Sequence, residues 1–124
     1  MYNLEDLDAW KLAREFRKDI SKLTKAFPNE EKFSLTSQIL RASRSIAANI
    51  AEGFGRFHFQ ENVQFCRQAR GSLYETLEHI YCALDEQYIT QDEFNTIKLI
   101  FDNQIKVLNG YILYLKNAKS QTNK

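Results

Sequence analysis

Hydrophobic residues recur along this chain in steps of three and four, the spacing that places them on one face of an α-helix. Four segments show the pattern, at about residues 6–27, 34–53, 59–86 and 91–116. Pro28-Asn29 ends the first segment, and Thr90-Gln91-Asp92-Glu93 is typical of the capping box that opens a helix. We therefore predict four amphipathic helices, followed by a frayed polar tail at residues 117–124.

The connections between these segments are only a few residues long, so neighbouring helices are expected to run antiparallel. The sequence thus predicts one all-α domain over residues 1–124, an up-down-up-down four-helix bundle. In chain order, the positions expected in its core are Leu7, Trp10, Ala13, Phe16, Ile20, Leu23 and Phe27; Leu35, Ile39, Ala42, Ile46, Asn49 and Gly53; Phe59, Val63, Cys66, Arg70, Leu73, Leu77, Ile80 and Leu84; and Phe94, Ile97, Phe101, Ile105, Leu108, Ile112 and Leu115.

A second apolar row lies beside the core stripe of the last two helices. A monomeric bundle needs about one apolar stripe per helix, and extra tyrosines beside it are typical of a subunit interface. A core-facing stripe that is merely wide is the alternative. We expect self-association through Tyr74, Tyr81, Ile100, Val107, Tyr111 and Tyr114.

Composition places the chain among ordinary globular proteins, with 44% hydrophobic residues and a net charge of +1. The charge is unevenly distributed: residues 41–70 have five basic and two acidic side chains, whereas residues 71–93 have six acidic and no basic ones. Cys66 and Cys82 would lie about 24 Å apart on one helix, beyond disulfide reach. No signal pattern or long apolar run is present, so we expect a cytoplasmic protein that does not enter a membrane.

Two motifs in this chain resemble the sequence signature of a known protein family. They are Ser45-Ile46-x-x-Asn49-Ile50-Ala51-Glu52-Gly53 and the later Ala69-Arg70-Gly71-Ser72-Leu73-x-Glu75, and Leu4-x-x-Leu7-x-x-Trp10 and Phe27-Pro28 fit as well. Over about residues 4–115 the chain is similar to the small bacterial four-helix-bundle proteins encoded in intervening sequences of 23S ribosomal RNA genes. Phe57-His58-Phe59 is more aromatic than that family's pattern.

The resemblance implies a ring-like homopentamer. It also implies kinship with the accessory proteins of diversity-generating retroelements, which work with a reverse transcriptase and nucleic acid.

Within these motifs, most residues are expected to have structural roles. Asn49 lies on the core stripe, where a buried amide that bonds to a neighbouring helix would fix the register. Glu52 lies at a helix C-terminus, where the dipole disfavours a carboxylate, and Arg70 is the candidate partner. Gly71 lies within a helix and forms a small-residue patch with Ala69 and Ser72, which predicts close helix contact.

The sequence contains no motif for catalysis, cofactor binding or metal binding. His79 follows Thr76 rather than the glutamate of a di-metal bundle site, and no nucleophile or phosphate-loop motif is present. We expect a non-enzymatic protein that binds RNA, DNA or a ribonucleoprotein, with Phe57 and Phe59 available to stack on unpaired bases. An oligomeric protein scaffold is the alternative. The candidate phosphate-binding residues are Arg14, Arg17, Lys18, Arg41, Arg44, Arg56 and Arg67.

Overall fold

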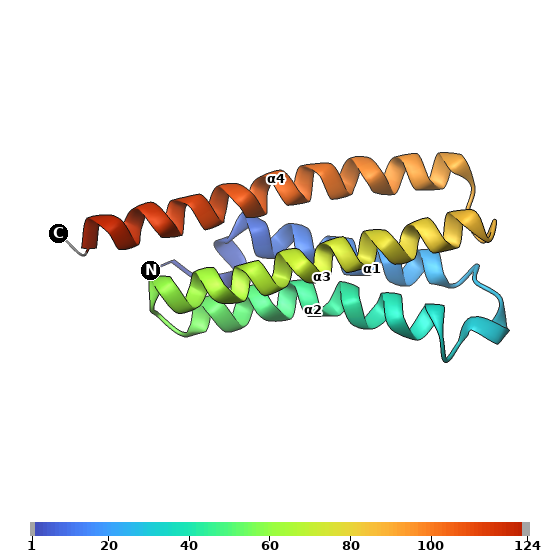
Figure 1. Ribbon diagram of the computed structural model, residues 1–124, viewed down its shortest axis with the longest axis horizontal. Coiled ribbons are helices and arrows are strands. Elements are labelled where there is room, and N and C mark those ends of the chain that lie inside the picture. The colour runs from blue at the N-terminus through green and yellow to red at the C-terminus, as the bar shows by residue number, and fades with distance from the viewer. Residues whose placement is uncertain (1, 123–124) are drawn as a thin grey trace.

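The computed structural model describes residues 2–122, which form a bundle of antiparallel helices (Figure 1). The helices are α1 (Asp8–Thr24), α2 (Leu35–Gly55), α3 (Phe59–Asp85) and α4 (Gln91–Thr122), with 3-10 turns at Leu4–Asp6 and Asn29–Glu31. The predicted all-α four-helix-bundle fold is confirmed. Both termini and the α2–α3 connection lie at one end of the bundle, and the other two connections lie at the opposite end (Figure 1).

The helix boundaries follow local chemistry. Helix α1 ends at Thr24 rather than near residue 27, because the next amides form tighter turns, such as Phe27 N–H to the Thr24 carbonyl at 3.0 Å, and because Pro28 disfavours a helical residue before it. The capping box is present: Glu93 N–H donates to Thr90 Oγ1 at 3.1 Å, and Thr90 N–H donates to the Glu93 carboxylate at 2.8 Å.

Helix α4 is longer than the pattern predicted. It continues to Thr122, so residues 117–122 are helical, while residues 123–124 of the predicted tail lie outside the described residues. The residues after Lys116 include neither proline nor glycine, so nothing in the local sequence stops the helix. Among the described residues, no helix is both long enough and apolar enough to cross a membrane.

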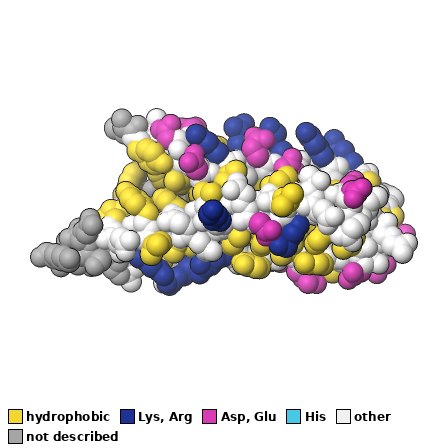
Figure 2. All heavy atoms as spheres, turned by 90° about the horizontal axis from the view of Figure 1, so that it is seen from above, with side chains coloured by type: hydrophobic (Ala, Val, Ile, Leu, Met, Phe, Trp, Pro, Cys, Tyr) yellow, Lys and Arg dark blue, Asp and Glu magenta, His cyan; other side chains and the backbone are white. Residues whose placement is uncertain are grey.

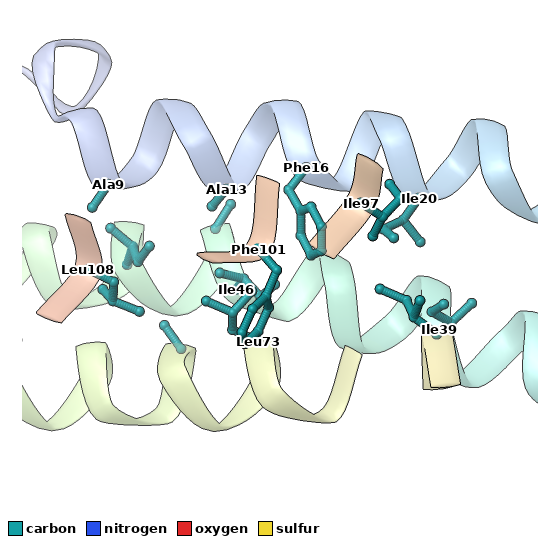
Figure 3. Close-up of a cluster of buried hydrophobic side chains, with 14 of the residues drawn as sticks. Ala9, Ala13, Phe16, Ile20, Ile39, Ile46, Leu73, Ile97, Phe101 and Leu108 are labelled. Atoms are coloured by element: carbon teal, nitrogen blue, oxygen red, sulfur yellow. The ribbon is translucent and has the colours of Figure 1, made fainter. Parts of the chain in front are cut away.

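The core lies between all four helices, where the aliphatic and aromatic side chains of each stripe meet (Figure 3). Phe16 of α1, Ile46 of α2 and Leu73 of α3 are fully buried there, and Phe101 of α4 completes the layer. Among neighbouring helices, α2 and α3 contact each other most extensively, whereas α1 and α4 contact each other least. The seam between α1 and α4 is therefore the loosest of the bundle.

Half of the predicted core stripe of α3 is confirmed, because Val63, Cys66, Leu73 and Ile80 are buried. At most of the other positions, the neighbouring residue is buried instead of the predicted one. Ala69, Thr76 and Ala83 are buried, whereas the expected Arg70, Leu77 and Leu84 are only partly buried and Phe59 is exposed. Small side chains on this stripe allow the close approach of α2. The Thr76 hydroxyl donates to the Ser72 carbonyl at 2.8 Å, so burying this polar group costs little free energy.

Gly53 lies within α2 rather than ending it. A Cβ atom at this position would lie 2.7 Å from Asn62 Oδ1 and 2.9 Å from the Cβ of Phe65, both on α3. Only a glycine permits this approach, so the last turns of α2 are pressed against the first turns of α3.

Candidate nucleic-acid interface

A shallow groove of about 740 Å³ follows the outer face of α2. Arg41 and Arg44 lie in it three residues apart, so the two guanidinium groups project from nearly the same side of the helix. We call this surface the α2 groove. Its lining comprises Lys32, Phe33, Thr36, Ser37, Leu40, Arg41, Arg44, Ser45 and Ala48.

The two arginines of the α2 groove are free to bind a ligand. Both are exposed, and among the side chains that the structure describes neither has a carboxylate within salt-bridge distance. A planar guanidinium can bind two phosphate oxygens at once, and the neighbouring Ser37 and Thr36 hydroxyls can donate to further oxygens. The α2 groove therefore has the donor set of a phosphate-binding surface.

The other predicted basic residues do not join this groove. Arg14 lies over the Trp10 ring on α1 at 5.8 Å, and Lys18 pairs with Glu15 at 3.5 Å. Arg17 is on the same helix and is partly buried. Arg67 of α3 lines a separate recess with Lys116 of α4.

Arg56 is already engaged at the end of α2. Its guanidinium bonds to Glu52 at 2.9 Å, approaches Glu61 at 3.8 Å and lies over the Phe65 ring. Lys and Arg side chains thus occupy several places on the molecule, interspersed with acidic ones, as one face shows (Figure 2). Among the seven predicted residues, Arg41 and Arg44 are the two that line one groove together, and no carboxylate or ring contact is seen for either among the described residues.

The signature residues fix the contact between α2 and α3. The Ser45 and Ser72 hydroxyls bond across the two helices at 2.6 Å. Asn49 is partly buried and donates to the carbonyl and hydroxyl of Ser45, within its own helix. The predicted amide link to a neighbouring helix is therefore wrong in detail, because Asn49 orients Ser45, which makes the link to α3. Ile46 and Ile50 of the same motif are buried in the core.

Two further predictions about the motifs are wrong. Glu52 pairs with Arg56 one turn along α2, and Arg70 donates to Asn109 of α4 at 2.8 Å, so the expected Glu52–Arg70 pair does not form. Gly71 is exposed, and a Cβ built there would meet no atom within 4 Å. It lies on the solvent side of α3, opposite the stripe that includes Ala69. Glu75, the last motif residue, is exposed and approaches His79 at 3.3 Å.

The predicted interface residues lie in different places. Tyr74 packs edge-on against Phe101, and Tyr81 packs against Phe94; these two tyrosines are exposed on α3. On α4, Ile100 and Val107 are partly buried, and Ile100 lies beside α1. Tyr111 and Tyr114 lie at the end of the bundle that holds the termini.

An aromatic pocket of about 310 Å³ lies at that end. Asn62 Nδ2 donates to the Tyr111 hydroxyl at 3.0 Å, and burial raises the pKa of Tyr111 to about 12. Phe57 and Phe59 line this pocket rather than the α2 groove, and Phe57 has a φ of 60°, an uncommon value for a residue with a side chain. We call this the end pocket; its lining is Tyr2, Phe54, Phe57, His58, Phe59, Asn62, Tyr111, Tyr114 and Leu115.

Sequence reasoning missed Lys32 and Phe33, which lie at one end of the α2 groove with the Lys32 ammonium 5.4 Å from the Phe33 ring centre. The sequence did show a lysine next to a phenylalanine just before the second helix. The exposure of Phe33 could not be inferred from it, because Phe27 in the same connection is buried. Among the described residues, no group of three His, Cys, Asp or Glu side chains could hold a metal ion.

The fold and the groove define a four-helix bundle in which Lys32, Arg41 and Arg44 line a groove on the outer face of α2. The model of the family of 23S rRNA-intervening sequence proteins matches residues 5–110, and the chain belongs to this family. It is similar to a solved structure from Bacteroides thetaiotaomicron, a protein of unknown function from the S23 ribosomal protein family. That likeness has a TM-score of 0.77 and 28% identity, and covers 84% of this chain and 94% of the other. No curated protein matches the chain.

Proposed function

We propose that this protein is a non-enzymatic, homo-oligomeric nucleic-acid-binding protein whose α2 groove contacts the phosphate backbone. The observation that supports this most is the pair of exposed arginines, Arg41 and Arg44, without a carboxylate partner among the described side chains. Most other cations of the candidate set are paired or stacked within the molecule. A family named for intervening sequences of 23S rRNA adds an RNA context.

The net charge of +1 makes a single groove a modest site. An oligomer repeats the groove, and several weak sites on one assembly bind a long polyanion with avidity. The homopentamer implied by the family resemblance would present five copies. The protein therefore has to oligomerise in order to bind, because the two arginines of one subunit give only a weak contact and several subunits together raise the affinity.

The test compares two double charge reversals by fluorescence anisotropy with labelled single-stranded RNA. Arg41→Glu with Arg44→Glu should abolish binding at about 50 mM salt, because two phosphate contacts per subunit become repulsive. Arg67→Glu with Lys116→Glu makes the same change of charge in the recess between α3 and α4 and should retain binding.

In the unmodified protein, log Kd should rise linearly with log salt concentration, with a slope of about 0.7 per phosphate contact on a single strand. Absence of binding at about 50 mM salt would refute the proposal. So would an equal loss in both double variants, because the effect would then come from net charge and not from the α2 groove.

The second candidate is an oligomeric protein scaffold with no affinity for nucleic acid, whose partners would include a reverse transcriptase by family resemblance. The exposed Tyr74 and Tyr114 and the end pocket favour this function, because tyrosine is enriched in protein interfaces. Light scattering distinguishes assembly from its absence in either case. A monomer mass at micromolar concentration would refute self-association.

A further inference from the structure

We propose that Phe33 is a stacking platform for an unpaired base, so that the α2 groove prefers single-stranded nucleic acid to a duplex. This inference rests on the proposed function and names its substrate class. The combination that supports it is an aromatic ring, held out in solvent by a fixed connection, at the end of a groove with unpaired arginines.

The exposure of Phe33 is unusual for its setting. Its side chain is 88% exposed, whereas Phe27, only six residues earlier in the same connection, is 8% exposed and packs on Tyr88 with ring centres 5.7 Å apart. Leu35, two residues later, is also buried. The large apolar side chains on either side of Phe33, Phe27 in the connection and Leu35 at the start of α2, are therefore buried, whereas Phe33 lies in water.

The backbone around Phe33 is held by one carboxylate. Glu31 accepts hydrogen bonds from the Ser34 hydroxyl at 2.7 Å, the Leu35 N–H at 3.2 Å and the Tyr88 hydroxyl at 2.7 Å. The Ser34 N–H also donates to the Glu31 carbonyl at 3.0 Å. These bonds tie both sides of Phe33 to the α3–α4 connection through Tyr88, so the ring projects from a rigid support.

The chemistry next to the ring matches a nucleotide strand. Arg41 and Arg44 bind phosphates along the groove, while the Phe33 ring, with the Lys32 ammonium over one face, offers its other flat apolar face to a base. Aromatic rings among cations are the usual means by which proteins hold single strands, since every base has a face that can stack. In a duplex both faces of each internal base are already stacked, so only an unpaired base can use this ring.

The test measures the affinity of Phe33→Ala for a labelled oligouridine of about 15 nucleotides, an abasic oligomer of the same length and a duplex. We expect about a fivefold or greater loss for the oligouridine and no change for the abasic oligomer or the duplex. Phe33→Trp should retain or increase the affinity for oligouridine. Phe33 is exposed, so neither change should alter the circular dichroism spectrum.

Phe57→Ala is the matched control, because Phe57 is also 88% exposed but lines the end pocket. It should bind oligouridine as the unmodified protein does. If Phe33→Ala lowers affinity for duplex and oligouridine equally, or not at all, while Arg41→Glu with Arg44→Glu abolishes binding, the stacking role is refuted and the proposed function stands. If the unmodified protein binds none of the three probes, the proposed function fails, and this inference fails with it.

Discussion

Replacing glycine with alanine should have opposite effects at two positions of this bundle. At Gly53, the added Cβ would lie 2.7 Å from Asn62 Oδ1, 2.9 Å from the Cβ of Phe65 and 3.1 Å from the Asn62 carbonyl. Two of these atoms are close to the backbone of α3 and cannot rotate away. At Gly71, no atom lies within 4 Å of the same added carbon.

The expected magnitudes follow from two competing terms. Alanine is better than glycine in a helix by about 1 kcal/mol, and this is the whole effect for Gly71→Ala, which should be stabilising. At Gly53, forcing α2 and α3 apart should cost about 3 kcal/mol, which leaves a net destabilisation of about 2 kcal/mol after the helix gain. The displaced Asn62 would also strain its hydrogen bond to Tyr111.

Urea unfolding followed by circular dichroism measures both effects. The protein concentration must be the same throughout, because self-association would change the apparent stability. A separate thermal unfolding experiment should agree, with melting temperatures that differ from that of the unmodified protein by about 3–5 °C per kcal/mol for a chain of this size. If Gly53→Ala were as stable as the unmodified protein, the close approach of α2 to α3 would be wrong. A destabilised Gly71→Ala would show that Gly71 is covered, for example by another subunit.

Three further predictions concern polar and titratable groups. The hydrogen bonds of Glu31, chiefly that from Ser34, hold its pKa below the ordinary value of 4.5, so its contribution to stability is complete above that pH and is lost as the pH falls through the lowered pKa; the difference in unfolding free energy between the unmodified protein and Glu31→Gln should therefore shrink on acidification. A double-mutant cycle with Ser45→Ala and Ser72→Ala should give a coupling of about 0.5–1.5 kcal/mol by urea unfolding, and additive losses would contradict a direct hydroxyl bond. Burial raises the pKa of Cys66 to about 12, so a thiol reagent at pH 8 should modify Cys66 only after denaturant is added.

The sequence predicted the helices well because their large apolar residues recur at regular spacing, and the Thr90–Glu93 capping box marked the start of α4. It was wrong at part of the α3 core stripe, where the buried residues are small or polar. Thr76 and Ala83 have a weaker apolar signal than Leu77 and Leu84, so the pattern chose the neighbouring residue at these positions. The close packing of α3 against α2 determines which of two neighbouring residues is buried. The spacing of apolar residues along one helix carries no information about that packing.

The candidate site was predicted only in part. Arg41 and Arg44 could be named, because their spacing places them on one exposed helix face. The contact of Arg56 with Glu61 depends on how α2 meets α3, which spacing within one helix does not reveal, whereas its pair with Glu52, four residues earlier, follows from helical spacing. The placement of Phe33 involves residues still farther apart in the chain, since its connection is tied by a hydrogen bond between Glu31 and Tyr88, which are 57 residues apart.

The loose seam between α1 and α4 has a consequence for the order in which the bundle opens. Amide hydrogens of these two helices should exchange with solvent sooner than those of α2 and α3, which are joined by the Ser45–Ser72 bond and the approach at Gly53. Partial opening would thus leave the central hairpin intact. Because the α2 groove belongs largely to that hairpin, its arginines would keep their spacing in a molecule whose outer helices had already separated.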